Sequence, residues 1–325
     1  MLRDAWGMSA TAAGSISAAF QLGYAISLVT FSALADRFGA RRVFQSSMVA
    51  SVLAAVGFAV FARSYRSGLI LYTLVAISQG GLYTTAIMLI SQRYAPERRG
   101  GAVGWLIGSS SFGYAASLVL CGLMLPRAGY AGAFVVTAAG PALGAFLVWP
   151  ALRSTPNVVH PAHERLRFTA GVLKNRRAMR LIVGYIGHNW ELLGMWAWTP
   201  AFVAASLAAS GAGFIKAAEL GAYSTASFHA MGLVASSSMG WLSDRLGSRR
   251  LLLVLAGVST ACSCTFGWLL GAPGPIVLAV GALYAFTALG DSPILSATLT
   301  HAVRPSSLGS ALALRSLLGF GAGSV

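Results

Sequence analysis

Few ionisable side chains lie inside long apolar stretches, where a charge is expensive and is usually retained for function. Besides His229, and Glu219 near a helix end, there are four. They are His188, Glu191, Asp291 and Arg315. In the helices that these stretches predict, the last three lie roughly 12 to 15 Å from one end, near the middle of a bilayer. A buried carboxylate there can carry a proton, because burial disfavours its charged form and a nearby cation favours it. We predict that Glu191 and Asp291 couple transport to a proton or a cation, with Arg315 as counter-charge or as an anchor for an anionic substrate.

The face of the apolar stretch around Glu191 carries, at helical spacing, Gly184, His188, Glu191, Met195 and Trp198. The histidine and the acid therefore point the same way. His188 could relay a proton or hydrogen-bond a ligand, or it could be a packing residue with satisfied hydrogen bonds. For Asp291 and Arg315, a structural ion pair is the competing interpretation.

Polar residues at helical spacing on several stretches predict a wet interior. We expect a solute cavity lined by Gln21, Tyr24, Gln79, Tyr83, Trp198, His229 and Tyr284. Hydrogen bonds between helices are the competing explanation for such polar faces. The sequence has no His pair at metal-ligand spacing, and Cys121, Cys262 and Cys264 fall inside apolar stretches. We therefore expect no metal site, no cofactor and no disulfide framework.

The stretches that must position these residues are long enough to cross a membrane. Hydrophobic residues make up 56% of the 325 residues and charged residues 10%, whereas a soluble chain has about a quarter of its residues charged. Runs of roughly 18 to 26 apolar residues match about 30 Å of hydrocarbon. They predict an all-α integral membrane protein with ten helices, at 11–34, 43–61, 68–91, 101–125, 131–150, 181–207, 218–242, 251–271, 274–300 and 307–325.

The net charge of +15 would ordinarily suggest nucleic acid as a partner, but the charges lie in the links between apolar runs. Seventeen Lys and Arg residues fall in the links on one side and four in the links on the other. The positive-inside rule makes the richer side cytoplasmic, so the expected partner is the lipid bilayer and not nucleic acid.

The longest of the basic links, 151–180, predicts a cytoplasmic linker between an N-terminal bundle at 1–150 and a C-terminal bundle at 181–325. A stripe of Leu166, Ala170, Leu173 and Arg177 favours a basic amphipathic helix on the inner leaflet for part of this linker. A flexible tether is the alternative.

A short signature occurs twice, 208 residues apart, each time between two apolar runs. Its two copies comprise Asp36, Arg37, Gly39 and Arg41, and Gly240, Asp244, Arg245, Gly247 and Arg249. The offset suggests two duplicated six-helix bundles. A weaker repeat at the same offset aligns residues 98–102 with 306–310. An aspartate at a helix end, beside backbone dipoles and arginines, can latch neighbouring helices in one conformation; alternatively, the arginines only set orientation and touch lipid phosphates.

The duplicated signature resembles that of the major facilitator superfamily of secondary transporters, where it lies between the second and third helices and again between the eighth and ninth. The second copy fits at Gly240 and Asp244, whereas the first has Ser32 in place of the glycine and Ala40 at the first basic position. The resemblance implies two bundles around a central cavity. On the family's twelve-helix plan, the chain looks like helices two to eleven; a genuine ten-helix transporter is the alternative.

The resemblance implies a transporter that moves a small organic solute, anionic solutes included, by alternating access coupled to protons. It also implies a monomer in the inner membrane. Passive facilitation by the same fold and a truncated chain that does not transport are the alternatives. An integral membrane enzyme would have to use His188, Glu191 and His229 as a metal or acid–base set. No extramembrane domain is long enough to bind a soluble co-substrate, so we expect no enzyme.

Overall fold

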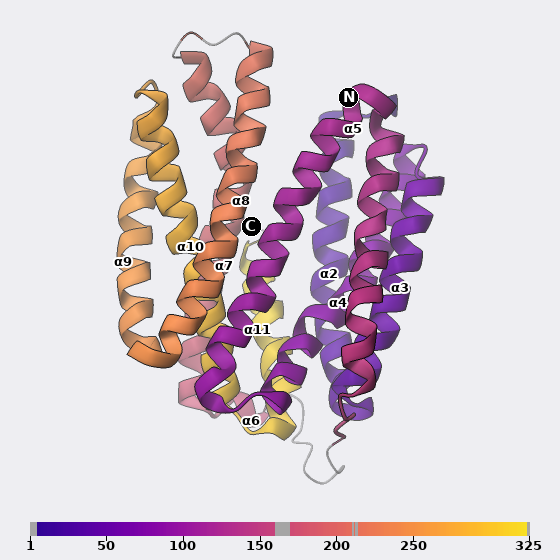
Figure 1. Ribbon diagram of the computed structural model, residues 1–325, viewed down its shortest axis with the longest axis vertical. Coiled ribbons are helices and arrows are strands. Elements are labelled where there is room, and N and C mark those ends of the chain that lie inside the picture. Colours follow the sequence, from indigo (N-terminus) through magenta and orange to yellow (C-terminus); the bar gives the residue numbers. More distant parts are fainter. Residues whose placement is uncertain (1–4, 160–169, 210, 212–213, 324–325) are drawn as a thin grey trace. The chain divides into compact units, whose positions relative to one another are not determined.

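A computed structural model describes residues 5–159, 170–209, 211 and 214–323, and these residues form helices and turns without a strand (Figure 1). In lipid, a helix satisfies every backbone N–H and C=O within one segment, which explains why apolar runs of this length become helices. The helices are α2 (Ala10–Phe38), α3 (Ala40–Phe61), α4 (Tyr65–Arg93), α5 (Pro96–Arg153), α6 (Ala170–Leu173), α7 (Arg176–Ala209), α8 (Phe214–Leu246), α9 (Ser248–Phe266), α10 (Gly274–Ala302) and α11 (Leu308–Gly323), with 3-10 turns η1 (Gly267–Leu269) and η2 (Pro305–Ser307).

Each of the ten predicted spans corresponds to a helix in the described residues, which confirms the all-α class. Helix α5 holds two of them, Pro96–Cys121 and Arg127–Arg153, and Gly129, with φ of 63°, interrupts its helical geometry. Within the described ranges, seven segments are long and apolar enough, by length and composition, to cross a membrane. The other three predicted spans lie in α7 and α8, which carry more polar residues, and in α11, which is 16 residues long.

The signature glycines produce the tight breaks after α2 and α8. Gly39 has φ of 90° and Gly247 has φ of 88°, a region that residues with a Cβ rarely adopt. In both copies a single residue separates two long helices. The two signatures therefore form the same local structure, as expected for a duplication.

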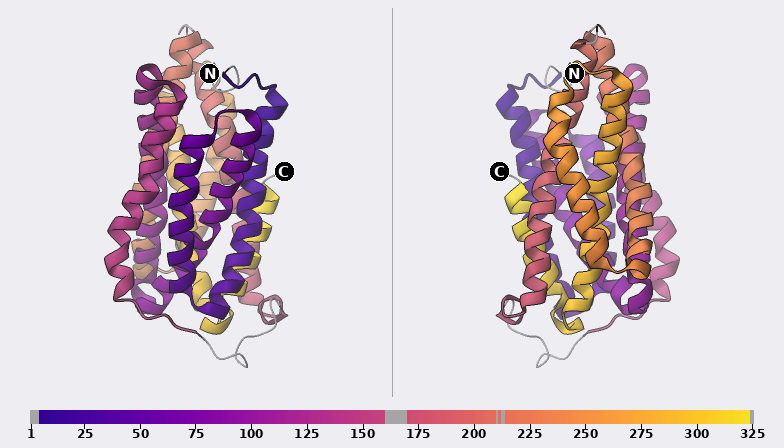
Figure 2. Two further views of the ribbon diagram at one scale, coloured as in Figure 1. Left: turned by 90° about the vertical axis from the view of Figure 1, so that its right-hand side faces the viewer. Right: turned by 90° about the vertical axis from the view of Figure 1, so that its left-hand side faces the viewer.

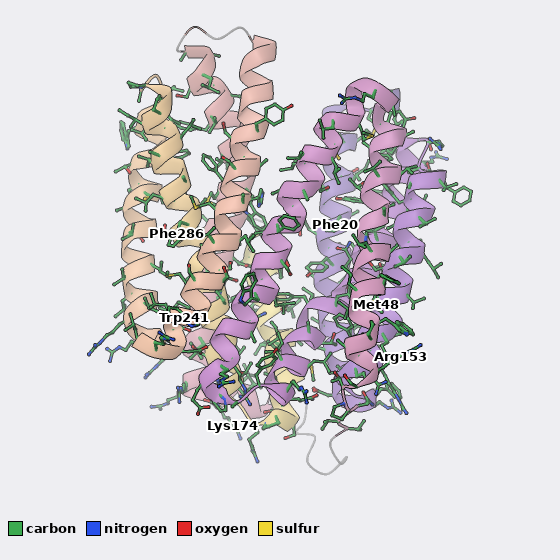
Figure 3. All side chains as sticks on the ribbon, viewed as in Figure 1. Phe20, Met48, Arg153, Lys174, Trp241 and Phe286 are labelled. Atoms are coloured by element: carbon green, nitrogen blue, oxygen red, sulfur yellow. The ribbon has the colours of Figure 1, made fainter. Side chains whose placement is uncertain are left out.

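The chain forms two compact units, and each draws on separate parts of the sequence. Unit 1 comprises Met1–Leu89, Leu120–Ile182 and Ala302–Val325. Helix α11 packs along α2 in this unit. Aromatic rings join α2, α3, α4 and the second span of α5: Phe20, labelled in Figure 3, lies 4.5 Å from Tyr72 between ring centroids, and Phe58 lies 4.7 Å from Phe134.

Unit 2 comprises Ile90–Val119 and Val183–His301. Its core is formed by α7, α8, α9 and α10, with Leu192, Phe228, Phe266 and Tyr284 among the buried residues. Phe286 packs against this core. Figure 2 shows α9 and α10 side by side in orange and gold, joined through η1.

The linker is described only in part, because residues 160–169 lie outside the described ranges. The predicted amphipathic stripe, which begins at Leu166, therefore falls partly outside the structure described here. At the end of the linker, Asn175 accepts hydrogen bonds from the N–H groups of Arg177 and Ala178, both at 3.1 Å, and caps α7. Its Nδ2 donates to the carbonyl of Ala302 in the same unit at 2.7 Å.

Candidate functional site

Two of the predicted coupling residues form a buried pair in unit 2. Nδ1 of His188 on α7 lies 2.7 Å from Oδ1 of Asp291 on α10, and the two side chains are 1% and 14% exposed. The ring of Tyr185 lies 5.5 Å from the imidazole, one turn earlier on α7. The structure thus gives Asp291 an imidazole as its close partner.

A proline lies two residues after Asp291, at position 293 inside α10. Proline has no N–H, so it cannot donate to the carbonyl of Leu289 four residues earlier. The hydroxyl of Ser236 on α8 donates to that carbonyl at 3.1 Å. Ser236 and Pro293 therefore join α8 to α10 close to the buried pair. Ser236 lies on a polar face that helical spacing predicted together with His229, and hydrogen bonding between helices was the favoured explanation for such a serine. Pro293 was not predicted from the sequence, although a proline just after an acid in an apolar run is a recognisable signal.

Glu191 lies three residues after His188 on α7 and has different partners. The hydroxyl of Ser259 on α9 donates to its Oε1 at 2.7 Å. The hydroxyl of Tyr284 on α10 also interacts with the Glu191 carboxylate. Glu191 is thus held by groups from two other helices of unit 2.

A small pocket lies inside unit 2 next to these residues. Its lining includes Trp196, Thr199, Thr225, His229, Phe266 and Tyr284. The room that it leaves, about 10 Å³, is close to that of one water molecule. The pocket is therefore sized for a single polar group in this structure.

An aromatic cluster surrounds His229 at the pocket. The imidazole stacks on Tyr114, with ring centroids 5.2 Å apart and planes at 18°, and the Trp196 centroid lies 5.4 Å from it. Within the described residues, Nε1 of Trp196 and Nδ1 of His229 are buried without a hydrogen-bond partner. A ligand atom in the pocket could satisfy groups of this kind.

The predicted cavity-lining residues His229 and Tyr284 do line this pocket, whereas Trp198 is 75% exposed. Trp196 lines the pocket instead. At about 100° per residue, two positions that are two residues apart point to nearly opposite sides of a helix. Both tryptophans therefore cannot face the same pocket, and spacing from Glu191 alone did not identify the right one.

The remaining predicted cavity residues belong to unit 1. Gln21 is exposed and Gln79 is half-buried. The ring of Tyr24 lies 5.4 Å from that of Phe320, which joins α2 to α11. The guanidinium of Arg315 on α11, 1% exposed, lies 5.6 Å from the ring centroid of Tyr83 on α4. A buried arginine over an aromatic face is a favourable cation–π arrangement.

The second signature copy forms a specific contact with the start of α5 in unit 2. The N–H groups of Gly100 and Gly101 donate to the two carboxylate oxygens of Asp244, at 3.0 and 2.8 Å. Backbone N–H groups near a helix N-terminus favour an anion. Gly240, one turn before Asp244, packs against Gly100 and Gly104, where a Cβ would overlap the backbone of α5.

The first signature copy forms the corresponding contact in unit 1, with the start of α11. The hydroxyl of Ser310 donates to Oδ2 of Asp36 over a long 3.4 Å. A Cβ on Gly309 would overlap the same carboxylate. Gly309 and Gly101 are 208 residues apart, so the weak repeat at 98–102 and 306–310 supplies the facing element in both units.

The linker residues before position 160 hold the first signature loop. Nη1 of Arg41 donates to the carbonyl of Thr155 at 2.8 Å. Asn157 donates to the carbonyl of Phe38 at 2.9 Å and accepts from the N–H of Arg42 at 3.2 Å. Gly39 leaves room for this asparagine, since a Cβ there would overlap its side chain.

The other signature arginines lie on the surface of their units. Arg37 is exposed and lies over the ring of Phe38, 5.3 Å from its centroid. Arg245 lies 3.8 Å from the ring centroid of Trp241, a residue labelled in Figure 3. Arg249 is exposed. Among the described residues, no three His, Cys, Asp or Glu side chains are grouped so that they could hold a metal ion.

Comparisons with known proteins agree with this architecture. Among curated proteins, NiaP, a candidate niacin/nicotinamide transporter of Bacillus subtilis (strain 168), is 27% identical over 133 residues, which are 41% of this chain and 33% of that protein. The chain thus matches about a third of that relative's length. The structure of the proton:xylose symporter XylE aligns with a TM-score of 0.75 and 16% identity, over 99% of this chain and 80% of that one. The structure of the Escherichia coli fucose:proton symporter FucP aligns with a TM-score of 0.74 and 14% identity, over 97% of this chain and 82% of that one.

Long apolar helices and a duplicated signature between them define a multi-span membrane protein. Residues 1–325 match the family model described as Major Facilitator Superfamily, and the chain belongs to that family. The resemblance inferred from the sequence is thereby confirmed. The likeness to XylE and FucP is below 25% identity and shows the fold alone.

Proposed function

We propose that this protein is a proton-coupled secondary transporter of a small organic solute, working by alternating access. The observation that carries the proposal is the buried His188–Asp291 pair, with Glu191 one turn away and bonded to Ser259. Ionisable side chains within a membrane raise the free energy of the folded protein, so they are usually retained because they bind protons or solute. Carboxylates that keep hydrogen-bond partners in both protonation states suit a proton carrier.

The class of solute follows from charge and from one relative. The buried Arg315 beside Tyr83 supports binding of an anionic group, because a guanidinium pairs well with a carboxylate. NiaP is named as a candidate niacin/nicotinamide transporter. We therefore choose small ring carboxylates as the first compounds to test for transport. We further propose a monomer in the bacterial inner membrane, with both signature loops and the linker on the cytoplasmic side, since the basic links favour that orientation.

The test is uptake by proteoliposomes that contain the chain, with a panel of small organic acids beginning with nicotinate. Accumulation of a panel member above its outside concentration, dependent on an acidic outside, supports proton coupling. Uptake that only equilibrates whatever the pH gradient establishes passive facilitation by the same fold.

Glu191→Gln sharpens the test of coupling. Glutamine keeps the shape and much of the hydrogen bonding but cannot change charge. We expect gradient-driven accumulation to be lost while exchange of labelled for unlabelled solute continues. Glu97→Gln, an exposed acid at the start of α5, is the matched control and should accumulate normally. Accumulation at the unmodified rate in Glu191→Gln would remove Glu191 from coupling and leave Asp291 as the carboxylate to test.

A further inference from the structure

Tyr284 on α10 connects the pocket of unit 2 to Glu191. Its side chain lines the pocket. Its hydroxyl interacts with the Glu191 carboxylate and with Ser263. The residue is only 7% exposed, so water competes little for these contacts. A change in the protonation of Glu191 therefore reaches a group that faces the pocket.

The hydroxyl of tyrosine can donate one hydrogen bond and accept others. An ionised Glu191 only accepts, so the Tyr284 proton must point towards it. A protonated Glu191 can donate its own proton to the Tyr284 oxygen, which releases the tyrosine proton to point elsewhere. Uptake of one proton at Glu191 thus converts Tyr284 from an acceptor into a donor on its pocket side.

The lining of the pocket includes a second donor, Trp196. The indole N–H of Trp196 can only donate, and within the described residues its buried nitrogen has no hydrogen-bond partner. The space inside the pocket, about 10 Å³, admits one oxygen-sized group. Two donors around a space of this size match one acceptor oxygen.

We propose that this pocket binds a carboxylate or carbonyl oxygen of the transported solute, and that Tyr284 is the positioning residue through which protonated Glu191 selects that oxygen. The inference rests on the proposed proton-coupled transport. Because binding linkage is reciprocal, solute tightens proton binding at Glu191 by the same factor by which the proton tightens solute binding. Proton and solute then load together.

Other titratable groups lie near Glu191 or the pocket, and their effects on binding must be separated from that of Glu191. Cys262 on α9 interacts with the carboxylate. His188, three residues earlier on α7, pairs with Asp291 on α10. His229 on α8 stacks on Tyr114 and lies beside Trp196. Tyr284→Phe leaves all these groups in place and removes only the hydroxyl, so it isolates the proposed connection.

The experiment measures binding to the purified chain in detergent by calorimetry, with nicotinate as the probe and 3-picolylamine, an amine on the same ring, as the chemical control. We expect nicotinate to bind about tenfold tighter near pH 6 than near pH 8, and the amine to bind without this preference. Tyr284→Phe should lose about tenfold in affinity at the lower pH and lose the pH dependence. Tyr223→Phe, an exposed tyrosine on α8, should change neither.

A second pair of variants tests the donor on α7. Trp196→Phe keeps an aromatic ring but removes the N–H, and we expect nicotinate affinity to fall about tenfold. Trp190→Phe, on the same helix and 65% exposed, should bind like the unmodified chain. The inference would be overturned if nicotinate and 3-picolylamine bound equally or not at all. It would also be overturned if Tyr284→Phe kept the pH dependence of nicotinate binding. Either result would assign the pocket to a water molecule.

The proposed function fails in a different way. If the unmodified chain accumulates solute along a pH gradient while Tyr284→Phe binds nicotinate normally, only the role of Tyr284 is overturned. Binding of nicotinate that depends on pH and on Tyr284, without gradient-driven accumulation of any acid in the panel, overturns proton-coupled transport and leaves the pocket assignment standing.

Discussion

The carboxylate of Asp244 faces two adjacent backbone N–H groups at 3.0 and 2.8 Å, one for each oxygen. Such charge-assisted hydrogen bonds are stronger than neutral ones. The signature in the sequence identified this aspartate and its equivalent, Asp36. It did not identify their partners, because the N–H groups of Gly100 and Gly101 come from the backbone and leave little trace in side-chain chemistry. The weak repeat at 98–102 was the only sign.

Asp244→Asn should weaken the contact between α8 and the start of α5. An amide offers one acceptor oxygen instead of two, and its NH₂ group would face a backbone N–H. We expect a loss of about 1.5 kcal/mol of local stability and a changed transport rate, with solute affinity preserved. Transport kinetics and calorimetry on the same preparation measure this. Arg250→Gln, an exposed residue in the first turn of α9, should leave both unchanged. A parallel loss of binding and transport in Asp244→Asn would argue against a latch.

Helical spacing could not choose between neighbouring residues, and it was wrong for Trp198, which it placed on the cavity face although the side chain is 75% exposed. His188 and Glu191 do share one side of α7, yet they meet different helices, with Asp291 on α10 and Ser259 on α9 as partners. These partners depend on how the helices pack, which periodicity within one helix does not encode. The pairing of Asp291 with His188 therefore became visible only in the structure.

At the scale of elements, glycines determine how closely α5 and α8 approach. Gly100, Gly104 and Gly108 repeat every four residues along α5. A Cβ on Gly104 would lie 2.5 Å from the carbonyl oxygen of Ser236 and 3.3 Å from Cα of Gly240. Small residues allow such contact between membrane helices, where packing replaces the hydrophobic effect as the driving force. Sequence spacing alone does not say which helix such a stripe faces.

Gly104→Ala should destabilise unit 2. The added methyl group meets backbone atoms that cannot rotate away, so overpacking should cost about 1 to 3 kcal/mol. Gly113→Ala on the same helix is the matched control, because nothing lies within 4 Å of a Cβ there. Alanine also favours a helix by about 1 kcal/mol over glycine, so the control should be neutral or slightly stabilising. Thermal unfolding of both variants in detergent checks this, and equal melting temperatures would contradict the close approach.

At the scale of the whole molecule, the sequence predicted the helices well because hydrocarbon leaves few alternatives for the backbone. Every predicted span corresponds to a helix in the described residues. Packing between segments distant in sequence was not predicted. Helix α11 packs along α2 in unit 1, and the first span of α5 packs against α8 in unit 2. These contacts depend on glycines that allow close approach and on the hydrogen bonds of Asp36 and Asp244. A hydropathy profile reveals neither of these features.

The proposed orientation can be tested on the whole chain by cysteine labelling. The basic links should be cytoplasmic, since each positive charge makes transfer of a link across the membrane less favourable. After the three native cysteines are replaced by serine, Arg250→Cys should react with a membrane-impermeant maleimide in inverted vesicles but not in intact cells. Arg66→Cys, exposed in the first turn of α4 at the end expected on the opposite side, should show the reverse. The side on which each position reacts does not depend on which solute is transported, so labelling of both from the same side would refute the alternating topology itself.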